Sequence, residues 1–232
     1  QVVELVYKDS TSGYMVKQNN SPTALSADEY DTYTEATGGT VITSGSFKTH
    51  VFTGDGCFVV SGVGNEAGGG SAVEYLVIAG GGAGGTSEGG SAGGGGAGGF
   101  RSFICGSPNP LNAPAGLTVT TTTFPITVGA GGASESHLGP IQQGNDTVFS
   151  TITSAKGGAG RPGNPAVCSV SSFGTVPKMN GGSGGGGTGN APGSPLAGGG
   201  TGNTPPVSPA QGTNGGGGHT TGGHRAGGGG GG

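Results

Sequence analysis

The apolar residues of this chain occur in short alternating runs that are typical of strands. Phe47, Thr49 and Val51 fall on one face of a run in which Lys48 and His50 fall on the other. Alternation with a period of two predicts a strand with one covered face. Further short runs are rich in Thr and Val, which favour extended structure because they branch at Cβ. They lie at 58–60, 73–80, 100–105, 117–128 and 146–152.

Local signals add turns and one short helix to this pattern. The triplet Gly54–Gly56 carries Asp-Gly, which suits a tight hairpin turn between 47–53 and 58–60. Near the start of the chain, 2–7 and 13–17 predict two more strands, and Ser26 with Glu29 has the spacing of a helix capping box. No segment after Gly39 has long helical periodicity. We therefore predict an all-β, loop-rich fold.

Glycine changes this picture in the second half of the chain. The sequence contains 61 Gly in 232 residues, against about 7% in an average protein. From Gly181 onward roughly every second residue is Gly. Such a tail cannot fill an apolar core, because Gly has no side chain to bury and loses most entropy on ordering. It is either disordered or an array of backbones bonded to one another.

A repeat in the tail favours order. The unit GGGTGN-x-Pro begins at Gly185 and again at Gly198, and a third related unit begins at Gly212. Extended glycine with three residues per turn rises about 3.1 Å per residue and leaves its amides free for neighbouring strands. The sequence therefore predicts polyglycine-II-type extended helices packed into a bundle and separated by tight bends.

Composition argues against several partners and activities. Charged residues are 9% of the chain, the net charge is −4, and no basic patch is present, so no nucleic-acid partner is expected. The longest strongly apolar run, Tyr75–Ala79, is far shorter than the ~20 residues of a membrane-spanning helix, so no membrane insertion is expected.

The clearest chemical motif is Gly80-x-Gly82-x-x-Gly85, directly after a predicted strand. A dinucleotide site needs a helix to begin there, and the glycine-rich sequence that follows cannot make one. His219 and His224 match no standard metal spacing, and the acids form no catalytic pair. We expect no catalytic residue, no cofactor, no metal and no enzymatic activity.

The three cysteines are widely spaced and form no CxxC pair. We expect these cysteines, Cys57, Cys105 and Cys168, to act as small buried apolar residues. The alternative is one disulfide and one free thiol.

Several segments, in order, resemble the glycine-rich domain of bacteriophage structural proteins. They are TVITSGSFKTHVFTGDGCFVVSG, VEYLVIAGGGAGG, GGGGAGGFRS, ITVGAGG and NDTVFSTITSAKGGAG, within 40–232. The tail is also similar in composition to the polyglycine bundles of T-even phage tail-tip adhesins. This resemblance implies a virion surface protein, either a tail fibre or an adhesin, that contributes to host attachment.

The resemblance divides the chain into three parts. Residues 1–39 are a docking module by position, 40–180 a glycine-rich β domain, and 181–232 the polyglycine repeat bundle. The expected location is the virion surface, on tail or capsid, and extracellular. A capsid decoration or head fibre protein is the alternative, as is an extracellular glycine-rich structural protein of the ice-binding kind.

The expected partners are other virion proteins, a host receptor and further copies of the chain, as a trimer that shares a thin core. Because a glycine rod presents only backbone, recognition is expected in the bends, where Pro limits the cost of ordering. The candidate bends are 109–112, 137–142, 161–164, 190–196 and 203–209. The candidate receptor-binding residues are Asn109, Leu111, His137, Gln142, Arg161, Asn190, Pro192, Leu196, Asn203, Pro206 and Val207.

Overall fold

The computed structural model describes most of the chain from Thr32 onward and two strands before it. Described are residues 32–66, 68–87, 91–133, 142–163, 176–188, 198–218 and 227–231, with the backbone of 2–9 and 13–19. Strands β1 (Val2–Asp9) and β2 (Gly13–Asn19) form an antiparallel hairpin, which confirms the two strands predicted there. The described residues hold no α-helix, so the fold is all β with one short 3-10 helix, η2 (Val176–Met179).

The largest sheet has the order β13-β12-β11-β6-β3, and all its pairs are antiparallel. Its strands are β3 (Glu35–Thr37), β6 (Gly56–Gly62), β11 (Thr123–Thr127), β12 (Thr147–Phe149) and β13 (Ile152–Ser154). In β6, Phe58 and Val60 are buried while Val59 between them is 36% exposed, the alternation expected of a strand with one covered face.

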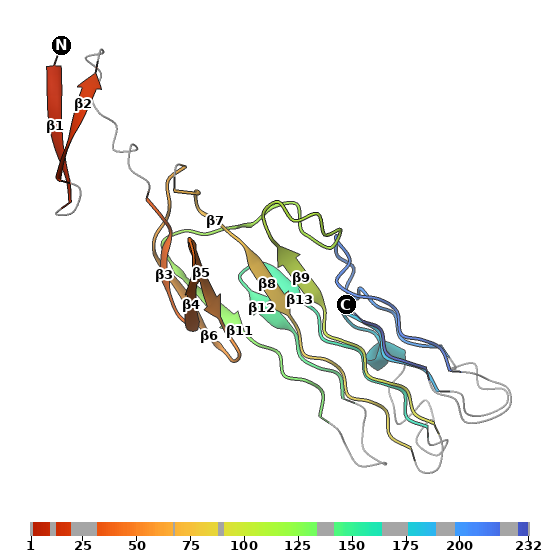
Figure 1. The fold of residues 1–232 in the computed structure, drawn as a ribbon. Helices are drawn as coiled ribbons and strands as arrows, with labels where there is room; N and C mark the ends of the chain where they lie inside the picture. Colours follow the sequence, from red (N-terminus) through yellow and green to blue (C-terminus); the bar gives the residue numbers. More distant parts are fainter. Residues whose placement is uncertain are drawn as a thin grey trace.

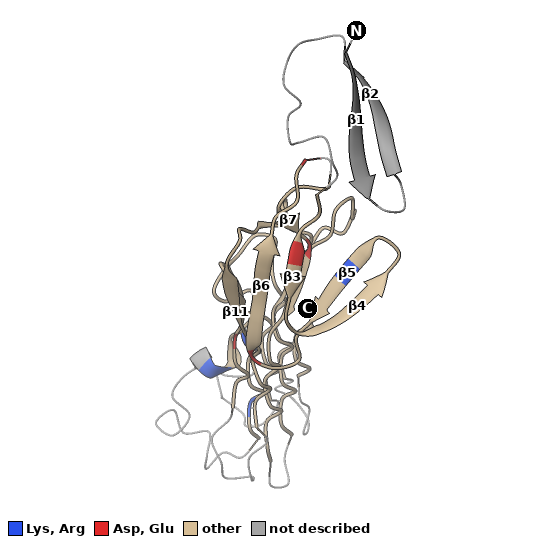
Figure 2. Cartoon of the chain, turned by 90° about the vertical axis from the view of Figure 1, so that its left-hand side faces the viewer, with Lys and Arg blue, Asp and Glu red and all other residues tan. Residues whose placement is uncertain are grey.

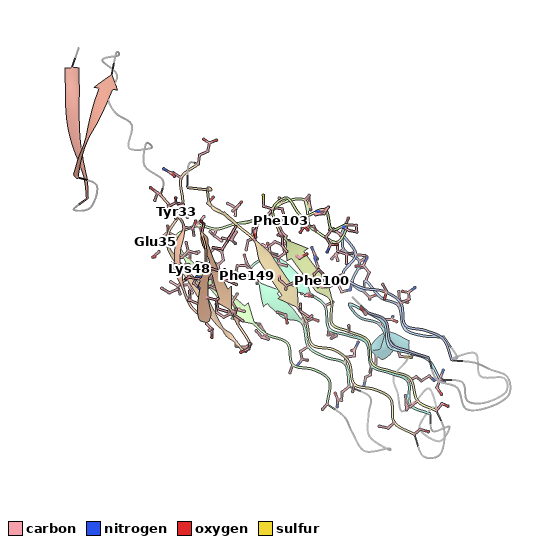
Figure 3. The ribbon with its side chains drawn as sticks, in the orientation of Figure 1. Tyr33, Glu35, Lys48, Phe100, Phe103 and Phe149 are labelled. Atoms are coloured by element: carbon pink, nitrogen blue, oxygen red, sulfur yellow. The ribbon has the colours of Figure 1, made fainter. Side chains whose placement is uncertain are left out.

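The apolar core lies on this sheet. Phe58, Val60, Val119 and Ile126 form its buried cluster. The ring of Phe58 meets the ring of Phe149 edge-on, with centroids 5.9 Å apart, an arrangement that favours aromatic pairs. Figure 3 shows Phe149 within this strand region, and the glycine-rich part of the chain beyond it carries fewer side chains.

A second hairpin pairs with no strand of the large sheet but contacts it through the ring of His50, which packs edge-on against Phe58. Strands β4 (Thr40–Ser44) and β5 (Phe47–Val51) pair only with each other and turn at Gly45, where φ is +56°. The hairpin predicted at 54–56 is therefore wrong, because β5 pairs with β4 and not with β6. None of the residues 54–56 has positive φ, and the Asp55 carboxylate instead accepts a hydrogen bond from the Val128 amide at 2.8 Å.

A smaller layer covers part of the large sheet. Strands β8 (Tyr75–Ile78) and β9 (Phe100–Phe103) pair antiparallel and lie against β12 and β13 (Figure 1). Val77 is buried against that layer, whereas Leu76 and Ile78 face outward and are 58% and 53% exposed. Beside them, β7 (Ala72–Val73) pairs with β10 (Leu117–Thr118).

Extended glycine-rich segments, here called rods, continue these strands away from the core (Figure 1). Rods 1, 3 and 5 follow β8, β11 and β13, and rods 2 and 4 lead into β9 and β12. Nine rods lie within the described residues: rod 1 (79–85), rod 2 (93–99), rod 3 (129–132), rod 4 (142–146), rod 5 (155–163), rod 6 (181–187), rod 7 (199–202), rod 8 (211–217) and rod 9 (227–231).

Other expectations need correction. Cys57 and Cys105 are exposed free thiols rather than buried apolar residues, and Cys168 lies outside the described residues. Ser26 and Glu29 also lie outside them, and the predicted helix does not reach 35–37, which is strand β3. Strand β3, before residue 39, pairs with β6, and rods from both sides of residue 180 bond to one another.

Candidate functional site

The rods hold one another by backbone hydrogen bonds that repeat every three residues. Between rods 5 and 6, the amide of Gly158 donates to Ser183, and the amide of Arg161 donates to Gly186. The same spacing recurs in the other rod pairs, parallel and antiparallel alike. Hydrogen-bonded residues at this spacing include 80 with 157 and 83 with 160 between rods 1 and 5, and 82 with 96 and 85 with 93 between rods 1 and 2. They also include 184 with 213 and 187 with 216 between rods 6 and 8, and 94 with 227 and 97 with 230 between rods 2 and 9.

Rod 6 shows how this repeat links many neighbours. The amides of Ser183 and Gly186 donate to rod 2, and those of Gly184 and Gly187 donate to rod 8. The carbonyls of rod 6 accept from rods 5, 7 and 9. A strand of a β-sheet bonds to two neighbours, whereas rod 6 bonds to five rods. Its buried backbone is therefore satisfied without any side chain.

These bonds arrange the rods in two rows. Rods 3, 1, 2 and 9 follow one another in the first row, and rods 4, 5, 6 and 8 in the second. Rod 7 packs on rods 6 and 8, and η2 contributes the carbonyls of Lys178 and Met179 to rods 5 and 6. The first row thus continues the β8–β9 layer, and the second continues the β12–β13 layer.

The close approach of the rods requires glycine at their interior positions. A Cβ added to Gly93 would lie 1.9 Å from the carbonyl oxygen of Gly186, and one added to Gly186 would lie 2.1 Å from that of Gly227. Atoms cannot approach so closely, so any side chain would force the rods apart. Outer positions differ: a Cβ on Gly198 or Gly228 meets nothing within 4 Å.

The chain reverses at the same end of the bundle after each outgoing rod. Rods 1, 3, 5, 6 and 8 run away from the strands, and rods 2, 4, 7 and 9 run back. We call the end remote from the strands the far end (Figure 1). The segments that join the rods there include residues 88–90, 134–141, 164–175, 189–197 and 219–226, which lie outside the described residues.

Of the candidate bends at 137–142, 161–164 and 190–196, the structure describes residues only at rods 4 and 5. Gln142 begins rod 4, where its carbonyl accepts from the amide of Ala83 at 2.9 Å. Arg161, near the end of rod 5, is only 8% exposed, which leaves little of its side chain for a partner. His137, Asn190, Pro192 and Leu196 lie outside the described residues.

The bend at 203–209 lies at the opposite end, beside the strands. Asn203 organises it, since its amide group donates to the Val207 carbonyl and its side-chain oxygen accepts from the Val207 amide, both at 3.1 Å. Pro206 is exposed and Val207 is half-buried. The Asn203 side chain is thus used within the bend itself.

Gln211, which sequence reasoning missed, anchors this bend to the core. Its side chain is 1% exposed, donates to the Pro205 carbonyl at 2.9 Å and accepts from the Ala155 amide at 2.8 Å. Its own carbonyl accepts from Phe100 at the start of β9. In the sequence, the only signal for this anchoring role was a long amide side chain between a Pro-rich bend and a glycine tract.

The bend at 109–112 also lies on the strand side. The exposed Asn109 accepts from the amide of Leu111 at 2.9 Å, and the Asn112 side chain exchanges two hydrogen bonds of 2.8 Å with the backbone of Ile104. The five candidate bends are therefore divided between the two ends of the bundle.

The remaining motifs take part in the bundle. The amides of Gly80, Gly82 and Gly85 donate to Asn145, Gly96 and Gly93, so they are occupied within the chain. Within the described residues, no three His, Cys, Asp or Glu side chains gather as metal ligands would. His219 and His224 lie outside them. Charged side chains are sparse over the rods (Figure 2).

No protein-family model, curated protein or solved structure matches this chain. Among the residues that the structure describes, none lies in an apolar helix of the length needed to cross a membrane.

Proposed function

We propose that this chain is a bacteriophage virion surface protein, a tail fibre or adhesin, that contributes to host-cell attachment. The observation that carries the proposal is the common end at which the rods reverse. The two-row bundle has few side chains and would serve as a support. Its outgoing rods 1, 3, 5, 6 and 8, remote from one another in sequence, all run toward the same end of the molecule. The resemblance of 40–232 to phage glycine-rich domains points to the same role.

The rods are proposed to be polyglycine-II-type helices. Three residues per repeat is the spacing of that helix, which has no internal hydrogen bonds and therefore offers all its amides to neighbours. The three-residue period of the bonds between rods and the contact of rod 6 with five others support this assignment.

The proposed partners are a host-cell receptor at the far end, other virion proteins and further copies of this chain. Receptor recognition is assigned to the segments joining the rods at the far end, because most interior rod positions are glycine and the few side chains there are buried. The candidates Asn190, Pro192, Leu196, His137 and Gln142 belong to them. The bends at 109–112 and 203–209 are on the strand side and fit a structural role better.

The test exchanges far-end segments for Gly-Ser sequence of equal length. Segments 134–140 and 190–196 are replaced singly and together in the particle that carries this chain, and adsorption to host cells is measured. We expect adsorption to fall at least tenfold in one of these variants. The matched control replaces the exposed residues 108–110, on the strand side, and should adsorb normally.

The melting temperature of each purified variant shows whether the bundle is intact, since no interior rod residue is changed. Normal adsorption by the double far-end variant, with an unchanged melting temperature, would contradict the assignment of the receptor site to these two segments.

A further inference from the structure

The first row of rods has an outer face on which the lattice of hydrogen bonds is incomplete. In rods 1 and 2 the amides of residues 80, 82, 83, 93, 94, 96 and 97 all donate to other rods. Among the residues that the structure describes, the amides of Gly81, Gly84 and Gly95 find no acceptor, and the carbonyls of Gly82 and Gly95 find no donor.

The geometry of the bundle explains which way these groups point. In rod 2, residues 93 and 96 donate to rod 5 while 94 and 97 donate to rod 9. Because successive residues of a threefold helix point 120° apart, the amide of Gly95 points to the remaining side, where no rod lies. In rod 1 the other amides donate to rods 2 and 4, so the amides of Gly81 and Gly84 point to the outer side in the same way. The free groups therefore recur every three residues on the outer side of the first row.

This face has two further properties that suit a close protein contact. A Cβ on Gly84 would have only one neighbour within 4 Å, at 3.9 Å, so the surface there is open. Toward the strands, the same side of the layer continues into Leu76 and Ile78, which are more than half exposed because Val77 faces the opposite way. The face is thus apolar over β8 and presents bare backbone donors and acceptors over rods 1 and 2.

We propose that this face binds the same face of a second copy of the chain. The proposal rests on the self-association in the proposed function and specifies its surface. An unpaired backbone row is a template for another backbone, as at an open sheet edge. Its occupant must repeat every three residues and lack side chains on the contacting side, and the rods of this chain meet both conditions. Since the face carries both donors and acceptors, it is complementary to itself, as a two-fold interface requires.

A two-fold axis parallel to the rods fits this interface. It keeps the far ends of both copies on the same side, and it sets Leu76 and Ile78 of one copy against those of the other. Each rod then packs against parallel and antiparallel rods of the second copy, and both kinds of rod pair are hydrogen-bonded within one chain. The geometry therefore points to a two-fold pair in place of the trimer expected from the sequence.

Sedimentation velocity of the full chain at micromolar concentration tests this interface. We expect a dimer for the unchanged protein and a monomer for Gly84→Val and for Leu76→Glu. The matched control is Gly198→Val, at an open position next to rod 7 on the other side of the bundle, and it should remain dimeric. Hydrogen exchange gives a second readout: the amides of Gly81, Gly84 and Gly95 should exchange more slowly in the dimer than in the Gly198→Val protein diluted to monomer.

The proposal would be overturned if the unchanged protein stayed monomeric at a concentration 100-fold above the micromolar range. It would also be overturned if Gly84→Val remained a dimer in which the amides of Gly81 and Gly95 exchange fast. The melting temperature of Gly84→Val at low concentration shows that the monomer remains folded. Adsorption to host cells is a separate measurement, so failure of the dimer leaves the attachment test unaffected and the reverse also holds.

Discussion

At the scale of single residues, polar side chains in this protein mostly complete backbone hydrogen bonds. Gln211 joins a Pro-rich bend to rod 5, Asn203 closes that bend, and Asp55 accepts from the amide of Val128. Ser183 does the same inside the bundle, where its hydroxyl donates to the carbonyl of Gly231 at 2.8 Å. Side chains are used here to finish a framework of main-chain bonds.

Replacing Gln211 by leucine should therefore destabilise the protein. Gln211→Leu keeps the volume but leaves the Ala155 amide and the Pro205 carbonyl without their partner. A buried polar group without a partner costs about 1–3 kcal/mol. Chemical denaturation should show a loss of this size, while the control Asn145→Leu, at an exposed amide, should stay within about 0.5 kcal/mol. Equal losses in both variants would contradict the anchoring role.

At the scale of elements, the strands could be predicted from sequence better than their pairing. Alternation located β5, β6, β9 and β12 to within a few residues. The Asp-Gly signal at 54–56 suggested that β5 pairs with β6, but β5 pairs with β4 through the turn at Gly45, and β6 pairs with β11 and β3, which are remote in the sequence. Local turn chemistry does not contain that information.

The site was less accessible to sequence reasoning than the fold. The repeat at Gly185 and Gly198 pointed to ordered rods, but glycine runs are alike, so nothing indicated which rods would be neighbours. The bends at 161–164 and 203–209 look similar as sequence, and the structure places them at opposite ends of the bundle. Their separation follows from rod direction, which the hydrogen bonds reveal.

The close packing of rods gives the next prediction. Gly186→Val and Gly199→Val each place a branched side chain where a Cβ would be 2.1 Å from a carbonyl oxygen of a neighbouring rod. We expect a loss of about 3 kcal/mol or more, because forced overpacking is among the larger single-residue effects. For a chain of this length that lowers the melting temperature by roughly 6–12 °C.

Gly198→Val is the matched control for Gly199→Val, because the two positions adjoin but a Cβ at 198 meets nothing within 4 Å. Its melting temperature should change by less than about 2 °C. If all three variants had the melting temperature of the unchanged protein, the rods would not be packed backbone to backbone.

At the scale of the whole molecule, strands and rods form one hydrogen-bonded body. Five rods are direct continuations of strands, and rods 6–9 are hydrogen-bonded to those five either directly or through one another. The buried apolar cluster lies in the strand region, whereas the described part of the bundle buries mainly alanines and Met179 and so gains little hydrophobic stabilisation of its own. Unfolding of the strands should therefore remove the support of the bundle.

Native-state hydrogen exchange tests this coupling. The amides of Gly158 and Gly186, inside the bundle, should exchange with the same free energy of opening as the amide of Val60 in the sheet, because one global transition exposes all three. In the protein diluted to monomer, solvent-facing amides such as Gly84 serve as the fast-exchanging reference. Protection of Gly158 and Gly186 that vanishes in mild denaturant while Val60 stays protected would show two independent units.

The three-residue period of the rods restricts how such a protein can change over generations. An insertion of one or two residues inside a rod shifts every later amide out of the three-residue period of its hydrogen bonds, whereas an insertion of three keeps that period and restores each pairing. The segments that join the rods are subject to no such rule. Variation in length and sequence can therefore accumulate there freely, while the rods change length only in steps of three residues.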